Sequence, residues 1–141
     1  MNQAGRHRRF LPILLGIAVA GIVISGYLTI THLSSVPLVC TVSAVVNCAA
    51  VTHSAYSVMP GTSVPITVVG AGWFVILAVL AIGPRRWLQL IWAGLGLVVV
   101  IYLVYVEIVV LHQICEWCSV LHILILASLL ITIRQLQLEA D

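Results

Sequence analysis

Four long apolar runs constrain this chain more than any other feature. They cover residues 11–33, 64–82, 87–106 and 115–133, and Glu116 is the only charged residue within them. A helix of about 20 apolar residues crosses the hydrocarbon core of a bilayer and satisfies its own backbone polar groups. The pattern predicts an all-α integral membrane protein, a four-transmembrane-helix bundle in which residues 1–141 form a single membrane domain.

The composition supports this class and excludes others. Of 141 residues, 62% are hydrophobic and 7% are charged, whereas a soluble domain has about 25% charged residues. The length leaves no room for a multi-domain enzyme. Six arginines without any lysine, and a net charge of +2, form no basic face of the kind that binds nucleic acid.

The arginines predict the orientation. Arg6, Arg8 and Arg9 precede the first run. Arg85 and Arg86 lie between the second and third runs, and Arg134 follows the fourth. With four spans these places share one side, which the positive-inside rule makes cytoplasmic. Both termini are then cytoplasmic, and the loop of residues 34–63 is extracytoplasmic. A cleaved signal peptide is the alternative for residues 6–33, but its apolar region is typically only about 7–15 residues long.

Few residues inside the runs suggest chemistry. The absence of charge at mid-depth argues against a channel or a proton pump, and Glu107 falls near the outer face. Histidines 32 and 53 are expected to be interfacial. Four glycines are expected to allow close helix packing, and these are Gly16, Gly21, Gly94 and Gly96.

The four cysteines form two pairs on the outer side, where disulfides persist. Cys40 and Cys48 lie in the outer loop, and Cys115 and Cys118 begin the fourth run. Residues at i and i+3 share a helix face, and the positive end of a helix stabilises a thiolate. The carboxylate of Glu116 has the opposite effect. The second pair is therefore a candidate redox dithiol.

Two other uses of the cysteines remain open. Both pairs could be static disulfides that staple a membrane scaffold without redox turnover. Metal chemistry fits less well, because a zinc site usually has two closely spaced cysteine pairs. A soft-metal transporter needs cysteines within the spans or on the cytoplasmic side, where this chain has none. No metal site is expected.

A redox dithiol at the membrane edge needs an electron acceptor. Two thiols release two electrons, and a quinone is the two-electron acceptor that dissolves in a bilayer. Cys118 lies one turn deeper than Cys115, so it is nearer the hydrocarbon. A relay follows, in which the loop pair faces a soluble protein and the helix pair faces the quinone, with thiol–disulfide exchange between them.

These residues resemble the bacterial homologues of the vitamin K epoxide reductase family. The matching features are Cys40 and Cys48 with seven residues between them, the stretch 51–57, Val64-Pro65 with Gly70, and the Cys115/Cys118 pair. The resemblance covers about residues 26–133. The related quinone-linked oxidases of the DsbB kind place their closely spaced pair in the first outer loop, so their order is reversed.

The resemblance implies a mechanism and a location. It implies a bundle around a quinone pocket, covered by the outer loop and a short interfacial helix after Cys48. Cys118 would react with the quinone, and Cys115 would be attacked by the loop pair. Cys40 and Cys48 would oxidise a separate secreted or periplasmic thioredoxin-like (DsbA-type) protein. The resemblance is to members without a fused thioredoxin-like domain. The location implied is a bacterial inner membrane.

Four further residues are implied to line the quinone site. Ser54 matches a serine beside the active site, and Trp73 would line the pocket unless it faces lipid. His122 stands where animal members have a tyrosine that binds a quinone carbonyl, although it could instead pack between helices. Ile66 replaces an asparagine with the same role and cannot donate a side-chain hydrogen bond. Ubiquinone, menaquinone and vitamin K types all remain open.

Overall fold

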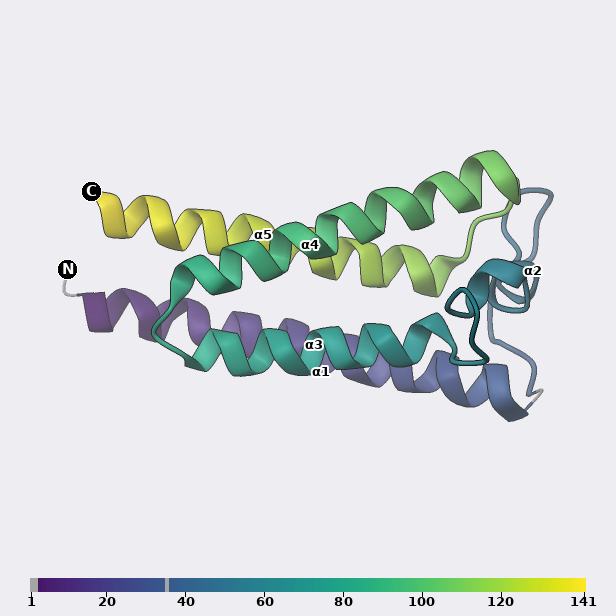
Figure 1. The fold of residues 1–141 in the computed structure, drawn as a ribbon, viewed down its shortest axis with the longest axis horizontal. Coiled ribbons are helices and arrows are strands. Elements are labelled where there is room, and N and C mark those ends of the chain that lie inside the picture. Colours follow the sequence, from purple (N-terminus) through teal and green to yellow (C-terminus); the bar gives the residue numbers. More distant parts are fainter. Residues whose placement is uncertain (1–2, 35) are drawn as a thin grey trace.

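The computed structural model describes residues 3–34 and 36–141, and these residues are mainly helical (Figure 1). The elements in chain order are α1 (Gln3–Ser34), α2 (Cys48–Thr52), the 3₁₀ helix η1 (Ala55–Ser57), α3 (Ile66–Ile82), α4 (Arg86–Tyr105), the π-helix η2 (Val106–Val110) and α5 (Glu116–Ala140). A short helix thus follows Cys48, as predicted.

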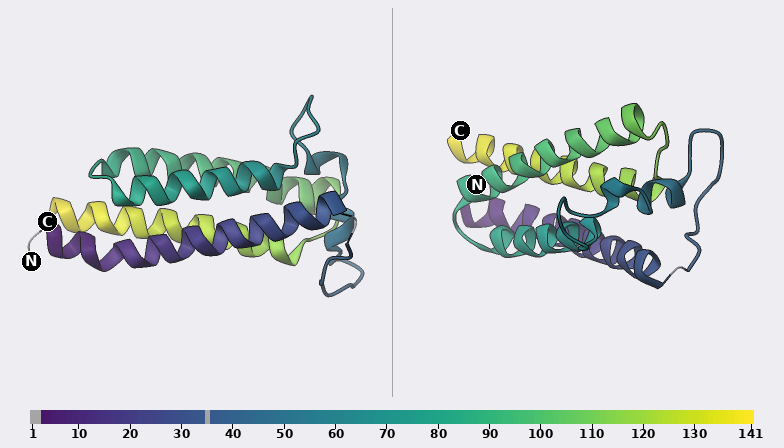
Figure 2. Two further views of the ribbon diagram at one scale, coloured as in Figure 1. Left: turned by 90° about the horizontal axis from the view of Figure 1, so that it is seen from below. Right: turned by 45° about the vertical axis from the view of Figure 1, so that its right-hand side comes forward.

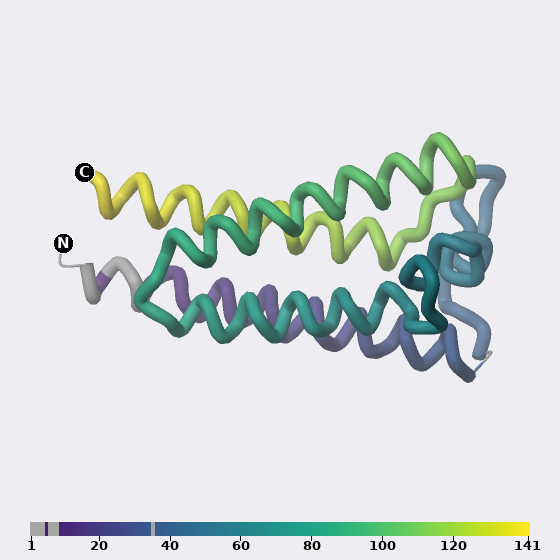
Figure 3. The backbone as a smooth tube through the Cα atoms, viewed as in Figure 1, coloured from purple at the N-terminus to yellow at the C-terminus, as the bar shows by residue number. Residues whose placement is uncertain are grey.

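The four long helices lie side by side. Helix α1 contacts α3 and α5, and α4 contacts the same two helices, so the bundle is roughly square in section (Figure 2). The start of α1, the α3–α4 turn and the C-terminus lie at one end (Figures 1 and 3). The outer loop, α2 and the start of α5 lie at the other. The structure therefore separates Arg9, Arg85 and Arg134 from the cysteines; the side chains of Arg6 and Arg8 fall outside the described part.

The helices are longer than the apolar runs at two places. Helix α1 begins at Gln3 rather than near residue 11, and α5 continues to Ala140 rather than ending near residue 133. Arginine, glutamine and leucine are good helix formers, so the helices continue beyond the hydrophobic residues. The middle two helices agree with the predicted runs to within two residues.

Among residues 3–34 and 36–141, three segments are long and apolar enough to cross a membrane, namely Arg9–Ser34, Arg86–Val110 and Glu116–Ala140. Helix α3 is also apolar but has 17 residues, which gives a length of about 25 Å. It packs along α1 within the same bundle. These lengths support a helical membrane bundle.

The outer surface of the bundle is more apolar than that of a soluble domain, and polar side chains are found among the buried residues. The buried positions include small polar and amide side chains, among them Ser25, Thr31, Gln89, Ser128 and Thr132. Aliphatic side chains are exposed instead, including Val19, Val23, Val79, Val98, Ile123 and Leu130. Small polar groups packed between helices, with aliphatic groups facing outward, are typical of membrane helices.

Close helix packing depends on two of the four predicted glycines. A Cβ atom on Gly96 would lie 2.6 Å from Cζ2 of Trp73 and 2.8 Å from Cγ2 of Ile125, and one on Gly21 would overlap the Phe74 ring. The prediction is wrong for Gly16 and Gly94, where a Cβ would meet nothing within 4 Å. Those two glycines lie on open faces of α1 and α4.

Replacing Gly96 with alanine should therefore destabilise the bundle. We expect Gly96→Ala to lower the free energy of unfolding by about 1–3 kcal/mol, because the added methyl overpacks the contact with α3 and α5. Unfolding in detergent, followed by circular dichroism, measures this change. Gly94→Ala is the matched control, and it should be neutral or slightly stabilising because alanine favours helix. Equal effects of the two changes would contradict the packing described here.

Candidate active site

The four cysteines gather at one end of the bundle. Cys40 and Cys48 form a disulfide with a Cα–Cα distance of 6.2 Å, while Cys115 and Cys118 are free thiols. Cys48 is the first residue of α2 and is 1% exposed. The side chain of Asn47 caps this helix by accepting the N–H of Ala50 at 3.0 Å.

The outer loop is hydrogen bonded to the segment that leads into α5. Val46 and Ile114 form a parallel β-bridge, and the N–H of Asn47 donates to the carbonyl of Ile114 at 3.0 Å. Cys48 follows Val46 by two residues, and Cys115 follows Ile114 directly. The bridge therefore brings the two cysteine pairs to the same place.

The two residues between Cys115 and Cys118 also hold the loop. Glu116 Oε2 accepts the N–H of Thr41 at 3.2 Å, and Trp117 Nε1 donates to the carbonyl of Val39 at 2.8 Å. The Trp117 ring packs edge-on against Tyr27 of α1, with 5.3 Å between centroids. These side chains therefore hold the loop segment on both sides of Cys40.

Glu116 is also close to the loop disulfide. Its carboxylate oxygen and the sulfur atoms of Cys40 and Cys48 lie within 4.8 Å of one another. A negative charge here disfavours a thiolate on either sulfur after the disulfide is reduced. The same three side chains are possible metal ligands, but only in the reduced state, since the two sulfurs are bonded to each other here.

Cys115 is the N-cap of α5. The thiol of Cys118 hydrogen bonds to its sulfur, and the backbone N–H of Cys118 donates to the same atom at 3.3 Å. These hydrogen bonds lower the pKa of Cys115, against burial and the charge of Glu107, which raise it. The hydrogen bonds at the helix start therefore favour a thiolate at Cys115, a balance that the sequence alone leaves open.

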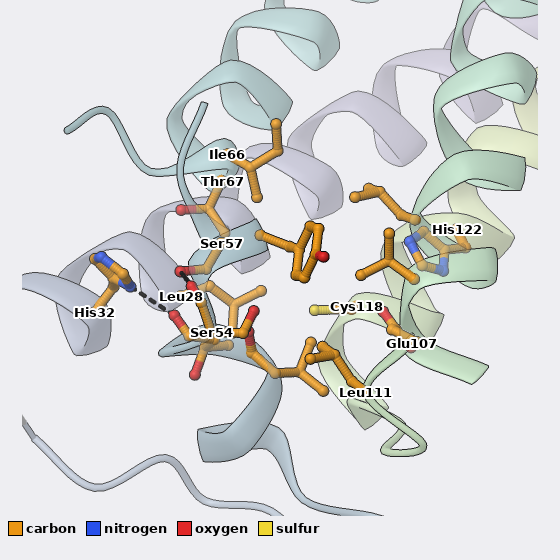
Figure 4. Close-up of a pocket in the computed structure, with 15 residues that line it drawn as sticks. Leu28, His32, Ser54, Ser57, Ile66, Thr67, Glu107, Leu111, Cys118 and His122 are labelled. Carbon is orange, nitrogen blue, oxygen red and sulfur yellow. Dashed lines mark hydrogen bonds between the residues drawn. The ribbon is translucent and has the colours of Figure 1, made fainter. Parts of the chain in front are cut away.

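Cys118 lies where two cavities meet. One, of about 50 Å³, lies beneath α2 and η1 (Figure 4), and a deeper one of about 120 Å³ lies between α3, α4 and α5. Five residues line both cavities, and these are Ile66, Thr67, Leu103, Cys118 and His122. The surface of both cavities is mainly apolar, but many of the residues that line the outer one are polar, whereas the deeper one is lined mainly by aliphatic and aromatic side chains.

The structure places all four predicted pocket residues on these cavities. Ser54 lines the outer one, Trp73 the deeper one, and Ile66 and His122 line both. Trp73 stacks on Trp92, with 6.2 Å between centroids, and its indole nitrogen is buried. It therefore faces the bundle rather than lipid. The roles of these residues stay predictions.

The sequence reasoning missed two residues of the cavity. Glu107 is 5% exposed and lines the outer cavity; a lone acidic residue after a long apolar run is a signal that could have identified it. His32, expected to be merely interfacial, also lines this cavity. Its Nδ1 lies 2.7 Å from the carbonyl of Thr52 in α2, and its ring stacks on His53.

Taken together, a helical bundle, a disulfide-bonded loop docked on a second cysteine pair, and an adjoining apolar cavity define a membrane thiol–disulfide oxidoreductase. The model of the vitamin K epoxide reductase family matches residues 12–133, and the chain belongs to this family. The family consists of thiol oxidoreductases that work with quinones. The predicted family is thus confirmed. A search of the curated proteins finds no match to the chain.

The charge beside the loop disulfide gives a testable prediction. Glu116→Gln keeps an oxygen that can accept the Thr41 N–H but removes the negative charge. We expect the reduced loop thiols to react with iodoacetamide about three- to tenfold faster at neutral pH, because their thiolates are no longer opposed by the carboxylate. Mass spectrometry of the Cys40 and Cys48 peptides measures the rate. Glu139→Gln, at the other end of the bundle, is the control, and an unchanged or slower rate in Glu116→Gln would refute the electrostatic effect.

Proposed function

We propose that this protein oxidises a thioredoxin-like, DsbA-type extracytoplasmic protein and reduces a quinone, and so supports disulfide bond formation. The observation that carries the proposal is the docking of an oxidised loop pair on a second pair that borders an apolar cavity. Such an arrangement provides a path for electrons from the protein surface to the membrane interior.

The proposal includes a specific membrane arrangement. Residues 1–141 form one domain in which α1, α3, α4 and α5 all cross the membrane, with both termini on the cytoplasmic side of a bacterial inner membrane. The location of the described arginines at one end supports this orientation under the positive-inside rule. A 17-residue α3 is at the lower limit of what spans a bilayer, and its packing along α1 supports its inclusion.

Electrons enter at the loop pair. Cys40 is partly exposed, whereas Cys48 is buried, so Cys40 is the sulfur that a protein thiolate can approach. Attack there breaks the Cys40–Cys48 bond and forms a mixed disulfide with the partner. The second partner thiol then resolves it, so that the partner leaves oxidised and both loop cysteines are thiols.

The loop pair then reduces the helix pair. Cys48 follows Val46 by two residues and Cys115 follows Ile114 directly, and Val46 and Ile114 are paired in the β-bridge. The Cys48 thiolate therefore attacks the oxidised Cys115–Cys118 bond at Cys115 in this proposal. Cys118 leaves as a thiolate beside the cavity, and Cys40 resolves the mixed disulfide. The loop is oxidised again, and two electrons now reside on the helix pair.

The cavity residues fit a quinone, whose ring is flat and largely apolar. Ile66 and Trp73 offer apolar surface, while Ser54 and His122 offer hydrogen bonds next to Cys118 (Figure 4). Since Ile66 has no donor, His122 is the residue that we expect to bind a quinone carbonyl. The quinone, of the ubiquinone, menaquinone or vitamin K type, supplies the capacity to accept two electrons and two protons.

Replacing Cys118 tests the proposed function. Purified protein is mixed with a reduced DsbA-type protein and a soluble menaquinone or ubiquinone analogue, and quinone absorbance is followed. We expect Cys118→Ala to lose at least about 99% of the reduction rate, since the sulfur beside the cavity is gone. Ser128→Ala, a small buried change in the same helix, is the control. No reduction by the wild-type protein, or full activity of Cys118→Ala, would overturn the proposal.

The redox state in cells distinguishes turnover from a static scaffold. In cells depleted of quinone, we expect the cysteines to accumulate as thiols, because electrons still arrive but cannot leave. Maleimide labelling followed by gel mobility measures the reduced fraction. Disulfides that stay intact under these conditions would instead support a stapled scaffold.

A further inference from the structure

One buried carboxyl group has no place in the relay described above. Glu107 lies on η2, where an inserted π-helical turn alters the register of the helix end. The side chain is 5% exposed and faces the cavity beside Cys118 and His122 (Figure 4). Turns of π-helix frequently occur at functional sites because they redirect a side chain.

The contacts of Glu107 do not indicate a structural ion pair. Its Oε2 accepts the backbone N–H of Cys115 at 3.5 Å. Within the described part of the chain, the one salt bridge is between Arg86 and Glu139, at the other end of the bundle. A buried charge normally requires a partner, so pairing with a cation is not the reason for a carboxyl group here.

The chemistry of the helix pair creates a need for a proton carrier. When Cys115 and Cys118 reduce a quinone, two S–H bonds break, one S–S bond forms, and two O–H bonds form on the quinone. The two electrons pass from sulfur to the quinone, and the two protons must follow. Cys115 is 0% exposed, so its proton has no direct contact with water.

We propose that Glu107 carries the proton from Cys115 to the quinone, an inference that rests on the proposed quinone reduction. The Glu107 carboxylate accepts the Cys115 proton as the Cys115 sulfur bonds to that of Cys118. The resulting carboxylic acid donates this proton to one quinone oxygen in the cavity and returns to its starting form. The proton of Cys118, which itself lines the cavity, passes directly to the other quinone oxygen. Glu107 accepts the backbone N–H of Cys115 at 3.5 Å and also lines the cavity, so its carboxyl group lies near both ends of this transfer.

Other titratable groups on the outer cavity are less suited to this transfer. His32 is engaged with the carbonyl of Thr52, and Tyr56 is 43% exposed. His122 borders Cys118 but follows it by one helical turn, and no hydrogen bond joins it to Cys115 in the described structure. Glu107 is thus the group that links Cys115 to the cavity.

The test uses Glu107→Gln in the full-length protein. Glutamine keeps the size and an oxygen for the Cys115 N–H, but it carries no proton. We expect kcat for quinone reduction to fall about a hundredfold, the usual scale of acid–base catalysis, with the quinone KM unchanged. Reduction of the loop disulfide by the partner should be unaffected. Glu107→Asp should recover part of the rate, and Glu139→Gln is the control with normal activity.

A spectroscopic measurement provides a readout independent of turnover. Time-resolved infrared difference spectra, recorded as the dithiol-reduced protein reacts with quinone, should contain a transient carboxylic acid band that is absent in Glu107→Gln. Normal kcat in this variant would overturn the proton role while leaving quinone reduction intact. So would a reduced kcat with an unchanged infrared difference spectrum, since the loss would then be structural. Absence of quinone reduction by the wild-type protein would overturn both proposals.

Discussion

The backbone contact between the outer loop and the segment before α5 is the interaction on which the site depends. The Val46–Ile114 bridge joins two stretches far apart in sequence, and the Glu116 and Trp117 side chains reinforce it. Without this contact, nothing in the 31-residue connection between α1 and α3 (residues 35–65) would fix the distance of its disulfide from the helix pair. With it, the loop that carries one pair is held against the segment that carries the other, and Cys118 of the second pair lines the cavity.

The helices provide the frame for that contact. Small residues such as Gly21 and Gly96 let the helices approach, while aliphatic side chains cover the outer surface. Polar side chains such as Ser54 and Glu107 line the outer cavity beside Cys118 but not the deeper one. A redox site at the edge of an apolar bundle can be reached by a soluble protein from one side and by a membrane-dissolved acceptor from the other.

Much of this arrangement could be predicted from the sequence, because apolar runs and cysteine spacing are local signals. The helices and the two cysteine pairs follow from such patterns, whereas Ser54 and His122, which line one cavity, are implied only by the family resemblance. The role of Glu116 in holding the loop, the contact of Glu107 with the backbone of Cys115 and the open face at Gly94 could not be predicted. These depend on distant segments meeting, and a single sequence without its tertiary contacts does not specify that.

Direct exchange between the loop and helix pairs is the central claim, and cross-linking tests it most directly. In Cys40→Ser/Cys118→Ser, only Cys48 and Cys115 remain. We expect them to form a disulfide on mild oxidation of the purified protein, and mass spectrometry of non-reduced peptides detects it. The control is Cys48→Ser/Cys118→Ser, in which Cys40 and Cys115 should join in lower yield. Failure of Cys48 and Cys115 to join, with the protein still folded, would contradict the account.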